Sequence, residues 1–164
     1  MLFFKTKQNV GQIVSRLMDQ VWHAVVTNGS QELAVACNIQ GEWLTKEMLA
    51  LSYSGAIRAL QSIGANDWQT HRDQVQSELG RLLVQELVSF LNEIEWQVGP
   101  WLDGAKGSYS QVPDADGAGA VFFNRVAATE NSDLVRQGIV KAGAATYQAA
   151  YSAVSALPKK FKVI

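Results

Sequence analysis

The stretch from Asp67 to Val98 constrains the fold most, because its apolar residues recur mostly at three- and four-residue steps. That spacing places them on one face of an α-helix. The stripe comprises Trp68, Val75, Leu79, Leu82, Leu83, Phe90, Ile94 and Val98, widened by Val84, Val88 and Leu91. A stripe this broad indicates contact with more than one neighbour. We therefore predict one long central helix that ends at Gly99-Pro100, with the other segments packed around it.

Four other segments show the same helical period and complete the predicted fold. They run from about Asn9 to Val26, Thr45 to Ile63, Ala120 to Ala128 and Ser132 to Leu157. The 164 residues are enough for one domain with a single core. We predict an all-α, single-domain bundle of about five or six helices. The small residues Ser54 and Gly55 are expected to let a neighbouring helix approach closely.

Residues 22–39 leave an alternative open. Residues 33–39 alternate between larger apolar side chains and polar or small ones, which is the period of a half-buried strand. Asn28-Gly29 is a strong hairpin signal, although the same pair can end a helix. Against a hairpin, the apolar pattern of the first helix continues into Val25, and an isolated hairpin is only marginally stable. An α+β fold with a small hairpin at 22–39 is the alternative.

The segment from Gly99 to Gly119 is rich in Gly, Ser, Asp and Pro, which favour turns. A loop of about twenty residues is longer than compact domains usually contain, and such loops are commonly functional or mobile. We predict a flexible loop here whose apolar residues bind a partner. The candidate partner contacts are Trp101, Leu102 and Tyr109 in this loop, Phe3 and Phe4 in the apolar N-terminal head, and Phe161 in the basic-apolar tail at 158–164.

The composition fits a packed protein with few charges. Hydrophobic residues make up 48% of the chain and charged residues 18%, with a net charge of −1. The charged share is below the usual value of about a quarter, which fits an apolar surface kept for a partner and fits a large core equally well. The single Cys37 excludes an internal disulfide. Because the sequence shows no signal-like or membrane-spanning apolar run, we expect a cytoplasmic or otherwise intracellular location.

The motifs that resemble known sites lack the spacing that their chemistry needs. Residues 99–108 do not contain the contiguous Gly-Lys-Ser/Thr of a phosphate-binding loop. Residues 114–117 lack the further acidic positions of a calcium loop and fit a turn. His23 and His71 lie on two predicted helices without a metal-binding spacing. We therefore expect no cofactor or metal and assign no catalytic residue.

These observations favour a non-enzymatic helical subunit of a larger assembly, acting through contacts with itself or other proteins. The alternative is a small helical subunit of a nucleoprotein complex, which would contact the nucleic-acid backbone through dispersed cations. The candidate cations are Arg72, Arg81, Arg136, Lys141, Lys159, Lys160 and Lys162. An enzyme or a metal- or ligand-binding helical protein is the third interpretation.

Overall fold

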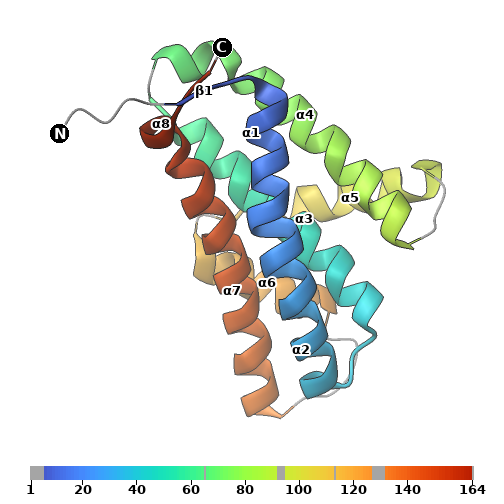
Figure 1. Cartoon of the computed structure of the whole chain (residues 1–164). Helices are drawn as coiled ribbons and strands as arrows, with labels where there is room; N and C mark the ends of the chain where they lie inside the picture. Colours follow the sequence, from blue (N-terminus) through green and yellow to red (C-terminus); the bar gives the residue numbers. More distant parts are fainter. Residues whose placement is uncertain (1–5, 65, 92–94, 113, 127–131, 164) are drawn as a thin grey trace.

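The computed structural model describes residues 6–64, 66–91, 95–112, 114–126 and 132–163, whose arrangement is shown in Figure 1. Nearly all of these residues are helical, so the predicted all-α bundle with a long central helix is confirmed. The alternative hairpin at 22–39 is wrong, because residues 22–37 are helical. None of the described helices is long and apolar enough to cross a lipid bilayer.

The first helical run consists of α1 (Val10–Leu17), the π-helical segment η1 (Met18–Thr27) and α2 (Asn28–Cys37). Asn9 starts this run through a capping box. Its side chain accepts a hydrogen bond from the Gln12 amide at 2.9 Å, and the Gln12 side chain accepts one from the Asn9 amide at 3.0 Å. The predicted start of the first helix is therefore explained by side chains that are adjacent in sequence.

The predicted end of that helix at Asn28-Gly29 is wrong. Val26, Ser30 and Leu33 are all buried at helical spacing, so contacts with the core hold the chain in a helix beyond the Asn-Gly pair. The residue with left-handed backbone is Asn38, at φ 52°, just after α2. An asparagine does end the helical run, as predicted, but it is Asn38 at the end of α2 rather than Asn28 at its start.

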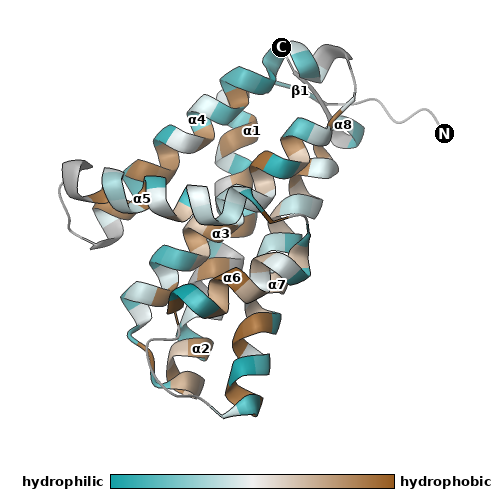
Figure 2. Ribbon diagram, turned by 180° about the vertical axis from the view of Figure 1, so that it is seen from behind, coloured by the Kyte–Doolittle hydropathy of each residue, from teal (hydrophilic) through white to brown (hydrophobic). Residues whose placement is uncertain are grey.

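The central helix is α3 (Gly41–Ser62), which contacts η1, α2, α4, α5, α6 and α7. Between Leu44 and Leu60 nearly every residue is buried, whichever side of the helix it faces. A helix that avoids water on all sides belongs in the interior, whereas an amphipathic helix needs water along its polar face. The prediction that Asp67–Val98 forms the centre is therefore wrong. Figure 2 shows that α4 carries both hydrophilic and hydrophobic positions, as a helix at the edge of the bundle does.

Two helices, α4 (Asn66–Leu91) and α5 (Glu95–Ser110), replace the single long helix that was predicted. The predicted stripe on α4 does face the core, with Trp68, Val75, Leu79 and Leu83 buried. The predicted end at Gly99-Pro100 is wrong, because Pro100 is an exposed residue inside α5. Helix α5 buries residues at four- and three-residue steps, and this burial outweighs the poor helix propensity of its glycines and proline. The residues are Val98, Leu102, Ala105 and Tyr109.

Helices α6 (Ala115–Val126), α7 (Asp133–Ser155) and α8 (Leu157–Lys160) complete the bundle. The predicted loop at 99–119 is wrong, because α5 extends to Ser110 and α6 begins at Ala115. The Oδ1 atom of Asp114 accepts a hydrogen bond from the Gly117 amide at 2.8 Å and so caps α6. Ser132 caps α7 in the same way. Asp114, which suggests a turn in the sequence, therefore marks the start of α6.

The described ends of the chain meet in a small parallel pair of strands that the sequence did not predict. Strand β1 (Thr6–Gln8) pairs with β2 (Phe161–Val163) in the register Thr6 to Phe161 and Gln8 to Val163. Both strands are three residues long, too short for a period-two pattern to be recognised. The pairing joins the two ends of the described chain at one end of the bundle (Figure 1).

Helix α7 packs most extensively on α3 and α6, and glycines make these contacts close. A methyl group built on Gly55 of α3 would lie 2.5 Å from the carbonyl oxygen of Tyr147. A methyl group on Gly119 of α6 would meet the carbonyl oxygen of Val140 at an even shorter distance. The close approach predicted at this segment is thus confirmed at Gly55, and its partner is the last long helix.

Candidate functional site

Those predicted partner contacts whose side chains the structure describes do not form an exposed surface. Leu102 and Tyr109 are only 2% and 1% exposed, because they lie on the buried face of α5. Trp101 is half-buried, and the ammonium group of Lys46 lies 4.3 Å from the centre of its ring. Leu102 and Tyr109 are therefore not exposed in this structure, and their contact with a partner stays a prediction. Phe3 and Phe4 lie outside the described residues, as does the side chain of Phe161.

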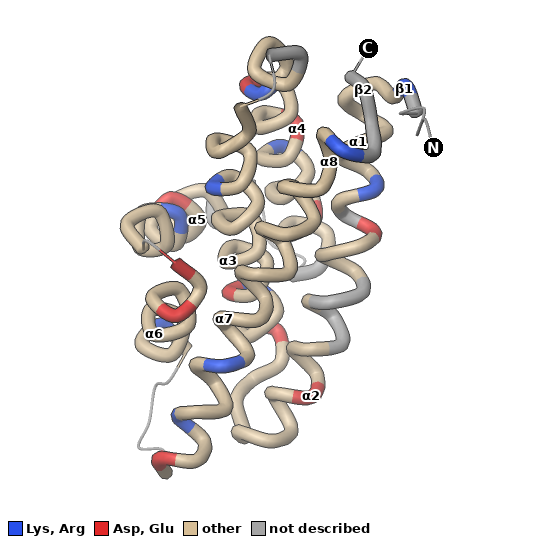
Figure 3. The backbone as a smooth tube through the Cα atoms, turned by 90° about the vertical axis from the view of Figure 1, so that its left-hand side faces the viewer, with Lys and Arg blue, Asp and Glu red and all other residues tan. Residues whose placement is uncertain are grey.

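The predicted nucleic-acid contacts lie on different helices, and Figure 3 shows the basic residues distributed over several elements. On α4, Arg72 is half-buried and Arg81 binds Glu78 with a shortest distance of 2.5 Å. On α7, Arg136 and Lys141 are exposed, and Arg136 packs over the ring of Phe123. Lys159 is exposed on α8, whereas the side chains of Lys160 and Lys162 lie outside the described part. The described cations are not collected into one basic surface, and nucleic-acid binding stays a prediction.

Among the described residues, an apolar groove with a volume of about 490 Å³ lies between α2 and α7. Its walls are formed mainly by small residues, which are Gly29 and Ala36 on α2 and Ala142, Ala145 and Ala149 on α7, together with the larger Leu33 on α2. The buried Met48 of α3 also lines the groove. The small side chains leave the groove open, because the methyl groups on its two walls do not fill the space between the helices.

Two large apolar side chains are highly exposed on the same two helices. Val35 on α2 is 86% exposed, and Leu134 on α7 is 81% exposed. The last turns of α2 and the first turns of α7 lie at the same end of the bundle in Figures 1 and 3. The apolar groove and the two exposed apolar side chains thus belong to the same two helices, whose outer surface we call the α2–α7 face.

The charges on this face have opposite signs on its two helices. Glu32 lines the groove from α2 and is exposed. Lys141 is exposed on α7 and lies one helical turn before Ala145, a residue of the groove wall. The face thus presents an acid on one helix and a base on the other.

A buried polar cluster lies on the other side of the bundle, where α3, α5 and α6 meet. Glu47 of α3 has a fully buried side chain, and its carboxylate accepts two hydrogen bonds of 2.7 Å from Arg125 of α6. The hydroxyl group of Tyr109 on α5 donates a third hydrogen bond of 2.9 Å to the same carboxylate. Arg125 also donates to the Ser108 hydroxyl at 3.3 Å. These bonds join three helices through one carboxylate.

This cluster is built for structure rather than for proton transfer. Burial, with the nearby Glu47 carboxylate, raises the pKa of Tyr109 far above its ordinary value, so its hydroxyl stays protonated. The hydrogen bond to Glu47 raises the pKa of Arg125, which keeps the guanidinium charged. A catalytic acid or base needs a pKa near the working pH and access to a substrate. The Glu47 carboxylate is held by three protein hydrogen bonds within the core and has no access to a substrate.

The histidines are not brought together. His23 lies between two carboxylates, 3.6 Å from Asp19 and 3.5 Å from Glu86. Within the described residues, no three His, Cys, Asp or Glu side chains are placed to hold a metal ion. The two histidines therefore form no shared site in this part of the chain.

Sequence reasoning missed Glu47, Arg125 and the groove. One signal for Glu47 was present, because it lies three residues after Leu44 and four before Leu51, on the buried side of α3. The groove needs two helices that are distant in sequence, so no local pattern could identify it. Comparisons with protein-family models, with curated proteins and with solved structures find no match to this chain.

Proposed function

We propose that the protein is a non-enzymatic, intracellular helical subunit that acts through protein–protein contacts, and that the α2–α7 face is its contact surface. The observation that carries the proposal is the exposure of Val35 and Leu134 on the two helices that form the walls of an apolar groove. Large apolar side chains that gather on one exposed surface are a common mark of an interaction site. Covering such a surface contributes about 25 cal/mol for each Å² of apolar area removed from water.

The shape of the groove favours a helix as the group that fills it. Gly29 and Ala36 on one wall and three alanines on the other allow a helix to approach closely without displacing large side chains. Val35 and Leu134 then supply larger side chains that can pack beside the incoming helix.

The charges favour a second copy of this chain as the partner. In a two-fold symmetric contact, each residue meets the same surface on the other copy. Glu32 on α2 of one copy can then face Lys141 on α7 of the other, and the pair occurs twice. The face is self-complementary in charge as well as apolar, which suits a homodimer.

Sedimentation velocity over about a hundredfold range of protein concentration tests the proposal. We expect the unmodified protein to sediment as a dimer at the upper concentrations and to dissociate on dilution. Ala145→Glu places a carboxylate on the groove wall, and Leu134→Glu removes an exposed apolar group, so both variants are expected to stay monomeric.

Gln69→Glu on α4 is the matched control, because it adds one carboxylate at an exposed helical position away from the α2–α7 face. This variant is expected to dimerise like the unmodified protein. A monomer at every concentration before any substitution contradicts the proposed partner. Equal weakening by all three substitutions contradicts the assignment of the face.

A further inference from the structure

A second hollow lies between α3, α4, α5 and α7, on a different part of the bundle from the α2–α7 face. Its volume is about 350 Å³, near the lower end of the range for pockets that bind small molecules. Its lining combines Tyr53, Ile57 and Arg58 of α3 with Lys106 of α5 and Tyr147 of α7. The pocket therefore has an aromatic and apolar interior with two cationic side chains, and we call it the tyrosine cleft.

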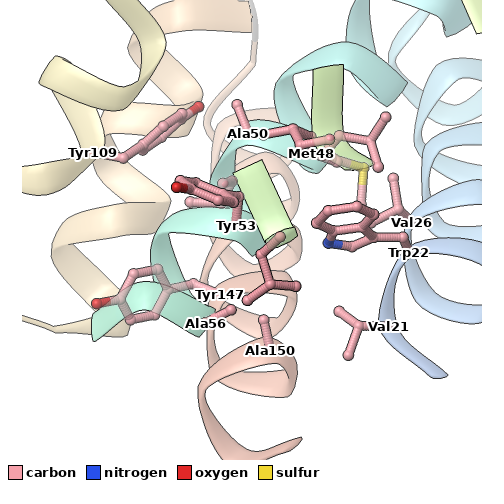
Figure 4. Close-up of a cluster of buried hydrophobic side chains, with 14 of the residues drawn as sticks. Val21, Trp22, Val26, Met48, Ala50, Tyr53, Ala56, Tyr109, Tyr147 and Ala150 are labelled. Atoms are coloured by element: carbon pink, nitrogen blue, oxygen red, sulfur yellow. The ribbon is translucent and has the colours of Figure 1, made fainter. Parts of the chain in front are cut away.

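The tyrosines offer hydrogen-bond donors within the cleft. Tyr53 is 8% exposed and Tyr147 is 3% exposed, yet neither hydroxyl donates a hydrogen bond to a described residue. Figure 4 shows the hydroxyl oxygens of both residues on the same side of the buried cluster. Burial raises the pKa of each, so both hydroxyls stay protonated and keep a hydrogen to donate near neutral pH. Neither hydroxyl is among the described side-chain donors that are buried without a partner, so both oxygens are reachable from solvent and a ligand in the cleft can accept a hydrogen bond from them.

The cations give the cleft its charge. The Lys106 ammonium lies 4.7 Å from the centre of the Tyr53 ring, which holds this flexible side chain at the cleft. Arg58 is exposed on α3. Neither cation forms an ion pair within the described part of the chain, and all the described residues that line the cleft are neutral or basic.

Asp114 is an acidic residue that acts on Tyr147, because its charge contributes to the raised pKa of that tyrosine. Glu47, in contrast, acts on Tyr109 and is already paired with Arg125. One of the Asp114 carboxylate oxygens already accepts the backbone-amide hydrogen bond that caps α6. The helix N-terminus partly balances its negative charge. The cleft therefore remains a site for an anion rather than for a cation.

We propose that the tyrosine cleft binds a small organic anion that carries one carboxylate or phosphate group on an aromatic or similarly flat apolar body. Lys106 and Arg58 hold the anionic group, and the Tyr53 and Tyr147 hydroxyls donate hydrogen bonds to it or to a polar atom beside it. Ile57 and the tyrosine rings cover the apolar body. A hydrogen bond between charged groups is stronger than one between neutral groups, so the anionic group dominates affinity.

Titration followed by two-dimensional NMR of the ¹⁵N-labelled protein tests this proposal with phenyl phosphate as the probe. We expect saturable shifts of backbone amides in α3 near Arg58 and in α5 near Lys106. Benzyl alcohol lacks the charge and inorganic phosphate lacks the ring, so each is expected to bind at least about tenfold more weakly than phenyl phosphate. Benzoate, which carries a carboxylate, is expected to shift the same amides.

Arg58→Gln and Lys106→Gln separate a binding role from a structural one. Each is expected to weaken phenyl phosphate binding at least about fivefold, whereas Lys7→Gln, at an exposed position of β1, leaves binding unchanged. Arg58 is exposed, so its variant is expected to keep the melting temperature and circular dichroism of the unmodified protein even if the Lys106 variant is less stable. Absence of saturable shifts overturns the proposal, as does equal binding of phenyl phosphate and benzyl alcohol. Unchanged binding in the Arg58 variant removes Arg58 from the site.

Discussion

The two sides of α7 show how small residues can either close a contact or leave one open. On its inner side, α7 meets Gly55 of α3 and Gly119 of α6 so closely that a methyl group at either glycine would collide with its backbone. On its outer side, Ala142, Ala145 and Ala149 face small residues of α2 across a groove. Small residues close a contact only where the two helix backbones touch. Where the backbones stay apart, small residues on both walls leave a space that another helix can fill.

The largest effect is expected from the polar cluster on the closed side. Glu47→Ala leaves the mostly buried Arg125 guanidinium without its carboxylate, and breaking such a pair usually costs about 3–5 kcal/mol of unfolding free energy. Urea denaturation of this variant measures the loss. Glu42→Ala, at an exposed position in the same helix, is expected to cost less than about 1 kcal/mol. Similar losses of unfolding free energy in the two variants would show that the hydrogen bonds of Glu47 do not stabilise the fold.

The next effect tests the closed contact itself. Gly55→Ala forces a methyl group against the Tyr147 carbonyl, and the helices must separate to admit it. We expect a loss of about 1–3 kcal/mol in unfolding free energy, the usual cost of excess volume in a packed core. Denaturant unfolding measures it. An unchanged midpoint would mean that α3 and α7 lie farther apart in solution.

A smaller, pH-dependent effect is expected from Tyr109. Its pKa is raised in the folded state, so folding favours the protonated phenol. The resulting stability is fully present below the unfolded value of about 10 and is lost as pH rises above it, by at most about 1.4 kcal/mol per pH unit. Tyr109→Phe should be less stable at neutral pH but should lose stability less steeply above pH of about 10. Thermal unfolding of both proteins across that pH range compares the slopes, and equal slopes would contradict the coupling.

The smallest effect lies on the open side of α7. Gly138 is exposed, has no positive φ, and an added methyl group would meet nothing within 4 Å. Gly138→Ala is therefore expected to stabilise the protein by about 0.5–1 kcal/mol, through the lower helix propensity of glycine. Denaturation is best measured at a concentration low enough to keep the chain monomeric. Destabilisation by more than this amount would show that the outer side is closed as well.

The helices could be predicted where their apolar stripes are strong, as in α1, α4 and α7. The sequence misled at Gly99-Pro100, because local breakers were given more weight than the buried period of Val98, Leu102 and Tyr109. The sequence also pointed to the wrong central helix, because the apolar stripe of α4 is clearer than that of α3. The fully buried α3 has little amphipathic contrast, since it is covered on all sides.

The candidate sites were less predictable than the helices. Glu47 meets a residue 62 positions away and another 78 positions away, so its partners depend on the tertiary fold. The groove and the tyrosine cleft likewise combine helices that are separated by long stretches of chain. Residue type and helical position could identify single side chains on these surfaces, but not which of them share a site.

The most direct test of the central claim is a charge-reversal cycle measured by sedimentation equilibrium. Glu32→Lys and Lys141→Glu each place like charges opposite one another in the proposed symmetric dimer, so each is expected to weaken dimerisation. The double variant restores opposite charges and is expected to recover most of the lost affinity. Additive weakening in the double variant, or no effect of either single substitution, would contradict a dimer formed through the α2–α7 face.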